Sequence, residues 1–224
     1  MSLPTQQPED RPVELPRGLV FGASSWLAAS WLVSLGLRPP LQPTSTAYTP
    51  AARMMVVAIM IGIVVAWPLL RLSTPRAHRP LLSASLDTIS LVSLTLLVIW
   101  PLRLVTTWSV DRLTTISMDL VANTILVGGL LAIVGVARRG ATAAMIAVMI
   151  LLVAPAVVAL GTPIEPSLSP SPLVRIWSIA SGGPAPLAPA AWSGAAVTVT
   201  VGLVLWLVAN RIQRSTLADS SGLR

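Results

Sequence analysis

Long apolar runs alternate along the chain with short polar breaks that are rich in Pro, Arg and Ser. The apolar runs are close in length to the roughly 20 residues that a helix needs to cross the hydrocarbon core of a bilayer. A helix suits lipid because it satisfies its backbone N–H and C=O groups within one segment. The pattern predicts an all-α, polytopic integral membrane protein, a bundle of about six transmembrane helices at residues 18–37, 54–70, 82–102, 120–137, 141–160 and 190–209.

Polar segments flank this predicted transmembrane domain, residues 18–209. Residues 1–17 are rich in Pro and charged groups and are typical of a disordered tail, and residues 210–224 form a second polar tail. A signal peptide is the alternative interpretation of the first apolar run. That run is long for a signal peptide, and the segment before it is acidic as well as basic, so we expect the first helix to be retained.

Two connecting segments contain enough apolar residues to contact the membrane. Residues 108–119 are amphipathic, which predicts a segment that lies in the membrane interface. Residues 170–183 place apolar side chains around Arg175, between Pro-rich and Gly-rich flanks. This second pattern predicts either a short interfacial helix or a re-entrant piece that caps the outer face of the bundle.

The distribution of Arg predicts the orientation of the bundle. An even number of spans places both termini on one side, and cytoplasmic segments of membrane proteins carry an excess of basic residues. The side that holds the termini has ten of the fifteen basic residues: Arg11, Arg17, Arg71, Arg76, Arg79, Arg138, Arg139, Arg211, Arg214 and Arg224. The opposite side holds Arg38, Arg53, Arg103, Arg112 and Arg175. We therefore expect both termini in the cytoplasm.

The composition supports a membrane location and excludes several function classes. Only 10% of the residues are charged, against about 25% in a soluble domain, and the mean hydropathy is +0.79. All basic residues are Arg, and this bias, together with abundant Ala, Val, Leu and Pro, is typical of a bacterial, GC-rich source; we therefore expect the bacterial cytoplasmic (inner) membrane. No basic cluster is longer than Arg138–Arg139, so nucleic-acid binding is not expected despite a net charge of +7. The absence of Cys excludes disulfides and thiolate chemistry.

A few polar residues fall within the predicted spans, where an Asp at the centre costs about 2.5–3.5 kcal/mol on insertion scales. Asp87 and Ser90 share one sector of the third span, which Ser93 continues, and Asp119 and Asn123 lie one turn apart at the start of the fourth. Asp87, Ser90, Asp119 and Asn123 are the candidates for a polar path that takes a substrate, a cation or a proton. The alternative is that both carboxylates lie near helix N-termini, where the dipole and the free N–H groups favour negative charge.

Small residues recur at helical spacing in the fourth and sixth predicted spans. In lipid such residues let helix backbones approach closely. The predicted helix-packing positions are Gly128, Ala132, Gly135, Gly194, Thr198 and Gly202. We expect contacts within the bundle; the alternative is a seam with a partner subunit.

No catalytic or cofactor motif accompanies these features. HExxH, GxSxG, the P-loop and GxGxxG are all absent, and the single His, His78, lies in a basic loop without an obvious nucleophile. We expect neither an enzyme nor a cofactor or metal site. The pattern favours the permease-like membrane subunit of a transport system energised by a separate partner, with the bilayer and other membrane or ATPase subunits as partners. The alternative is a non-transporting assembly or scaffold subunit of a membrane complex.

Overall fold

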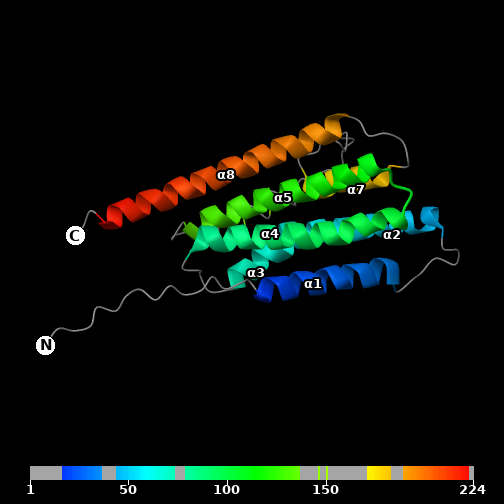
Figure 1. Ribbon diagram of the computed structural model, residues 1–224, viewed down its shortest axis with the longest axis horizontal. Helices are drawn as coiled ribbons and strands as arrows, with labels where there is room; N and C mark the ends of the chain where they lie inside the picture. Colours follow the sequence, from blue (N-terminus) through cyan, green and yellow to red (C-terminus); the bar gives the residue numbers. More distant parts are fainter. Residues whose placement is uncertain are drawn as a thin grey trace.

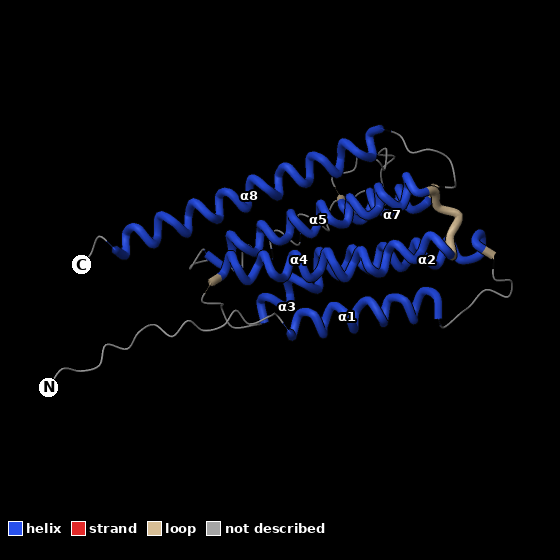
Figure 2. Tube along the Cα trace, viewed as in Figure 1, coloured by secondary structure: helices blue, strands red, loops and turns tan. Residues whose placement is uncertain are grey.

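The computed structural model describes residues 17–36, 44–73, 79–136, 171–182 and 189–221, together with Ile146 and Ile150. The secondary structure of this described part is helical, so the predicted fold class is confirmed (Figure 2). Five of its helical segments are long and apolar enough to cross a membrane: Arg17–Gly36, Ser45–Arg71, Pro80–Leu104, Val110–Val136 and Trp192–Ser215. The chain is a multi-pass helical membrane protein.

The helices lie side by side along the long axis of the molecule (Figure 1). Helix α1 (Arg17–Trp31) continues into a π-helical turn, η1 (Leu32–Gly36). Helix α2 (Ser45–Ile61) runs through a second π-helical segment, η2 (Gly62–Ala66), into α3 (Trp67–Ser73). Helix α4 (Pro80–Ile99) ends in a 3₁₀ turn, η3 (Trp100–Leu104). The remaining helices are α5 (Val110–Val136), α7 (Pro172–Ser181) and α8 (Pro189–Ser221).

Helices α1 and α4 run in one direction along the bundle and α2, α5 and α8 in the other, so that α1 begins and α8 ends at the same end (Figure 1). Helix α5 also ends there, at Val136, whereas α7 lies near the opposite end, where α5 begins. The predicted fifth span, 141–160, lies outside the described residues except for Ile146 and Ile150.

Two helices begin well before their predicted starts. Helix α2 begins at Ser45 instead of residue 54, and α5 begins at Val110 instead of residue 120. The segment 108–119, predicted to lie in the interface, therefore forms the first part of α5 for most of its length. Leu113 and Ile116 on this part are fully buried. The one-sided apolar pattern that suits an interface also suits a helix that packs one face into a protein core.

The last helix differs from its prediction at its C-terminal end. Helix α8 continues through Arg211 and Arg214 to Ser221, so most of the predicted tail 210–224 is helical. No Pro or Gly interrupts the chain between Ala209 and Gly222, and Arg, Gln and Leu are good helix formers. The polar residues after Ala209 therefore mark where the apolar part of α8 ends, whereas the helix itself continues to Ser221.

Helix α5 lies at the centre of the bundle and contacts α4, α7 and α8. The main core joins its apolar face to α1, α2, η2, α4 and α7, with Met55, Met60 and Leu120 fully enclosed. The outermost helices keep large apolar side chains exposed, such as Phe21 on α1 and Leu207 on α8. These exposed faces belong against lipid, because acyl chains replace water around a transmembrane bundle.

Candidate functional site: two buried ion pairs and the helix α7

Asp87, the first acidic residue of the predicted path, is fully buried on α4 and forms an ion pair with Arg71 of α3. Arg71 Nη2 also donates to Ser83 Oγ at 2.8 Å, and Trp67 Nε1 lies 3.5 Å from Asp87 Oδ2. Asp87 lies seven residues beyond Pro80, the first residue of α4, which is roughly 10 Å along the helix axis. Arg71, rather than the free N–H groups of a helix start, therefore balances this carboxylate.

The partner of Asp87 was not predictable from the spacing within α4 alone. The sequence identifies Arg71 only as one of the arginines that set the orientation of the bundle. In the structure, Trp67 and Arg71 stand one turn apart on α3 and both face Asp87 of the next helix. A short connection between two spans makes them antiparallel neighbours. An Arg at the end of one span and an Asp near the start of the next could therefore have predicted this ion pair.

Replacing Asp87 with asparagine is expected to lower the stability of the protein by about 1–2 kcal/mol. The change keeps the side-chain shape but removes the charge that pairs with Arg71. The cost stays below that of breaking a fully buried pair because the Arg71 side chain is 22% exposed. Thermal unfolding in detergent measures the loss, with Ser90→Ala on the same helix as the control within about 0.5 kcal/mol of wild type. If Asp87→Asn and Ser90→Ala lost the same amount of stability, the ion pair would contribute nothing to the stability of the protein.

Asp119, the second acidic residue of the predicted path, pairs with Arg175 of α7. Arg175 Nε donates to Asp119 Oδ1 at 2.6 Å, and the two side chains are 7% and 0% exposed. Asn123 Nδ2 donates to the backbone carbonyl of Asp119 at 2.8 Å. A Cβ atom on Gly194 of α8 would lie 3.2 Å from Arg175 Cδ, so this glycine lets α8 close over the Arg175 side chain. The result is an ion pair enclosed by three helices.

Helix α7 is the element that brings Arg175 into the bundle. Its ten residues span roughly 15 Å, half of what a membrane crossing needs. It lies alongside α2 and α5 at one end of the bundle (Figure 1), and Ile176 and Ile179 are 0% and 2% exposed. The short helix that both predicted placements of residues 170–183 require is present, and it packs alongside α2 and α5.

Two further arginines hold the C-terminal end of α7. Arg53 of α2 donates from Nη2 to the Ser181 carbonyl at 3.2 Å, and its guanidinium lies 5.1 Å from the centre of the Trp177 ring. The guanidinium of Arg112 of α5, 3% exposed, lies directly against Gly182. Positive charge at a helix C-terminus is favourable, as is a cation over an aromatic face. Sequence reasoning assigned Arg53 and Arg112 only to the topology, because nothing in the spacing connects them to α7.

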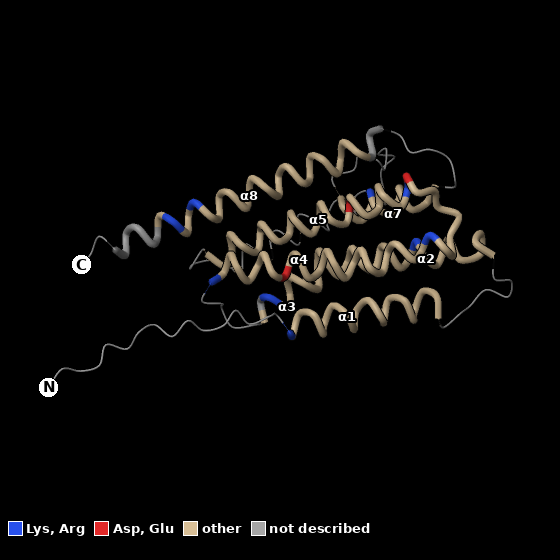
Figure 3. The backbone as a smooth tube through the Cα atoms, in the orientation of Figure 1, with Lys and Arg blue, Asp and Glu red and all other residues tan. Residues whose placement is uncertain are grey.

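The predicted polar residues do not form one continuous stripe. Ser90 is half-buried and Ser93 is exposed, whereas the buried face of α4 includes Asp87 and Thr95. Figure 3 shows one acidic segment within α4 and one within α5, away from the helix ends, and a further one at the start of α5. Asp87 lies toward the end where α4 begins and Asp119 toward the opposite end, where α5 begins. Among the described residues no hydrogen bond or ion pair joins the two carboxylates.

Five of the six predicted small residues lie at contacts between helices of the bundle, and the hydrogen bond of the sixth, Thr198, lies within α8. Gly128 faces Thr88, Trp67 and Trp206, Gly135 faces Pro80, Gly194 faces Arg175, and Gly202 faces Leu126 and Ile125. Ala132 packs with Ala84 and Ala209, and the Thr198 hydroxyl donates to the Gly194 carbonyl at 2.9 Å. Gly129, absent from the predicted set, completes the contact with α8: a Cβ atom there would lie 2.9 Å from the Gly202 carbonyl oxygen. Two glycines thus bring the α5 and α8 backbones together.

The chemistry of the site rests on its two carboxylates. Each has one oxygen bonded to Arg, while Asp87 Oδ1 and Asp119 Oδ2 have no hydrogen-bond partner among the described residues. A search of that part of the chain for three clustered His, Cys, Asp or Glu residues finds no candidate metal site. The arrangement can hold helices together and offers two buried acceptor oxygens to a donor or a proton. No protein family model matches the chain, and no curated protein or solved structure matches it either.

Proposed function

We propose that this chain is the membrane-spanning subunit of a transport system that a separate partner energises. The observation that carries the proposal is α7, a half-length helix held alongside α2 and α5 by the buried pair of Arg175 and Asp119. Helices that stop within the membrane are tolerated where protein buries them or where they line a cavity. Many secondary transporters build their substrate sites from such discontinuous helices. A scaffold that only spans the membrane has no need of one.

The energy source is proposed to be a second subunit, because the chain carries no P-loop of its own. Two carboxylates on separate Arg partners also give no relay along which this chain alone would move protons or ions. A permease subunit that responds to an ATPase at its cytoplasmic end fits both observations.

The same proposal places the chain in the bacterial cytoplasmic membrane with both termini inside. At the end where α1 begins and α8 ends, Arg17, Arg79, Arg211 and Arg214 are all exposed. At the opposite end, the guanidinium of Arg175 lies inside the bundle, as does that of Arg112, so fewer charges remain there to contact lipid headgroups. The exposed arginines therefore favour the first end as cytoplasmic. Protease accessibility of a tag on each terminus checks this orientation.

Purification of the tagged full-length chain from its native membrane in a mild detergent tests the transport proposal. We expect a nucleotide-hydrolysing subunit to co-purify in stoichiometric amount, and the purified complex to hydrolyse ATP. Membranes carrying the tag on an unrelated multi-pass protein serve as the control. Stoichiometric partners without an ATPase, such as redox or secretion subunits, would reject the proposal.

A non-transporting assembly or scaffold subunit is the second candidate. The observation in its favour is that both carboxylates of the predicted path are engaged by arginines, which also fasten α3 to α4 and α7 to α5. Buried pairs of this kind serve structure as readily as transport. The co-purification experiment separates the two candidates, since a scaffold brings its complex and no energising subunit.

A further inference from the structure

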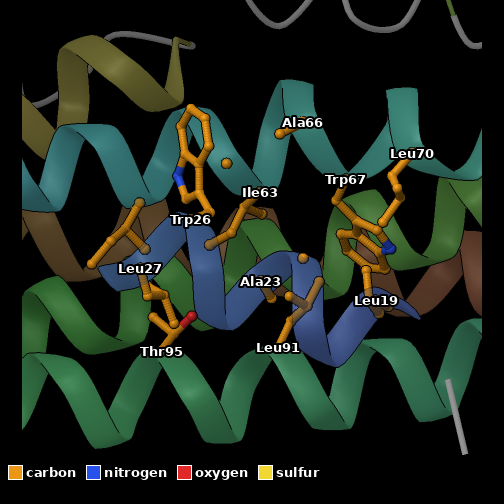
Figure 4. A pocket seen from close by; sticks show the side chains of 13 residues that line it. Leu19, Ala23, Trp26, Leu27, Ile63, Ala66, Trp67, Leu70, Leu91 and Thr95 are labelled. Carbon is orange, nitrogen blue, oxygen red and sulfur yellow. The ribbon is translucent and has the colours of Figure 1, made fainter. Parts of the chain in front are cut away.

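A small apolar cavity lies between α1, the α2–η2–α3 helix and α4 (Figure 4). Its volume is about 160 Å³. Figure 4 shows Trp26 of α1 with Ile63 and Trp67 in the upper part of the view, and Ala23 of α1 and Leu91 of α4 below them. The cavity is partly open and lies apart from the α7 site, since none of its lining comes from α5 or α7.

Both indole N–H groups of the lining residues have partners outside the cavity. Trp26 Nε1 donates to the Ala58 carbonyl at 2.9 Å, and Trp67 Nε1 is directed at the Asp87 carboxylate. Thr95 contributes the remaining polar side-chain group, a hydroxyl. An apolar cavity of about 150 Å³ stays dry and binds molecules such as benzene. The occupant that suits this cavity is therefore a hydrocarbon group rather than water.

The position of the cavity indicates where such a group comes from. Helix α1 forms the outer wall, and its other face carries Phe21 and Trp31, which are 77% and 52% exposed. Large apolar side chains on a transmembrane helix face acyl chains, so lipid lies beside this wall. An unfilled void forfeits the dispersion contacts of the atoms that line it. The nearest source of matching hydrocarbon is the bilayer itself.

We propose that this cavity binds the end of a lipid acyl chain, which enters from the bilayer beside α1. Gly62 of η2 lets the Trp26 indole form part of the cavity wall, because a Cβ atom on Gly62 would lie 2.6 Å from Trp26 Nε1. Segments of π-helix occur frequently at functional sites. The bound chain contacts Trp67, whose indole also meets Asp87, and so reaches the edge of the Arg71–Asp87 pair.

Two glycines of α1 provide a matched pair of variants. A Cβ atom on Gly22, which lines the cavity, meets only Leu70 Cδ2 at 3.9 Å, so leucine at this position fills the cavity without moving backbone. A Cβ atom on Gly18, one turn earlier, has nothing within 4 Å and lies outside the lining. Gly22→Leu and Gly18→Leu make the same chemical change on the same helix, and only the first removes the space.

Photo-crosslinking in phosphatidylcholine vesicles that contain a lipid with a diazirine on its acyl chain tests the proposal. After illumination, peptide mass spectrometry locates the adducts on the full-length protein. Wild type and Gly18→Leu should carry adducts on Trp67, Leu91 or Thr95, which are 2%, 7% and 3% exposed. They should also carry adducts on lipid-facing residues such as Leu97. Gly22→Leu should lose the cavity adducts and keep those on Leu97.

Two results would overturn the assignment. The first is wild-type labelling confined to lipid-facing residues, and the second is cavity labelling of a folded Gly22→Leu variant at the wild-type level. If Gly22→Leu does not fold, the wild-type adduct map decides alone, because the buried cavity residues are labelled only by a chain that enters.

Discussion

Leucine in place of Gly202 is expected to separate α5 from α8 and to destabilise the protein by about 3 kcal/mol or more, the upper range for overpacking a tight contact. A Cβ atom at this position would lie 2.9 Å from the backbone nitrogen of Leu126 and 3.0 Å from its Cα. These are backbone atoms of α5, so no side-chain rotation relieves the clash. The facing residue, Gly129, is equally confined, with its Cβ position 2.9 Å from the Gly202 carbonyl oxygen.

Alanine at Gly202 provides a sharper test, because its higher helix propensity should raise stability while its Cβ atom should clash with α5 and lower it. Alanine is favoured over glycine within a helix by about 1 kcal/mol, so a helix free of contacts would gain stability. At Gly202 the close backbone contact should win and lower the unfolding temperature in detergent. The control is Gly18→Ala on α1, where a Cβ atom has nothing within 4 Å and stability should be kept or slightly raised. Stabilisation by Gly202→Ala would contradict the close crossing of α5 and α8.

The average hydropathy of the sequence predicts where the membrane-spanning helices lie, but it does not predict where these helices begin and end. A window of apolar residues identifies the part of a helix that lies in lipid. At the start of α5, however, Arg112 and Asp119 lower the average hydropathy although both are buried in the bundle. At the end of α8, Arg211 and Arg214 mark the limit of the membrane-spanning part, whereas the helix continues to Ser221. Burial and helicity follow tertiary packing and helix propensity, which average hydropathy does not measure.

The acidic members of the candidate site were predictable and their partners were not. Asp87 and Asp119 stand out because charge is rare within an apolar run. Arg71 and Arg175 were interpreted as topology signals, since arginine at the end of a span usually extends to the headgroups. Pairing Arg175 with Asp119 requires α7 to pack between α2 and α5, a contact between residues 56 positions apart. No periodicity within one helix encodes such a contact.

Breaking the enclosed pair of Asp119 and Arg175 is expected to cost about 3–5 kcal/mol for either single variant, Asp119→Leu or Arg175→Met. Each change leaves the other charge buried, because the two side chains are 0% and 7% exposed. A single variant therefore loses the attraction of the pair and keeps the desolvation cost of the remaining ion. In Arg175→Met, α7 should also detach more readily from α5, which protease sensitivity near this helix would reveal.

The double variant Asp119→Leu with Arg175→Met distinguishes an ion pair from two independent contributions. With both charges removed, no ion remains buried, and an apolar contact of similar size replaces the pair. Apolar replacements of buried ion pairs are often neutral or stabilising, so the double variant should recover most of the stability lost by either single change. Denaturation of all four proteins in the same detergent completes the cycle. Additive losses in the double variant would show that the two residues act separately. If the proposed ATPase partner co-purifies, a double variant that recovers stability but loses ATP hydrolysis would show that the pair serves transport rather than structure alone.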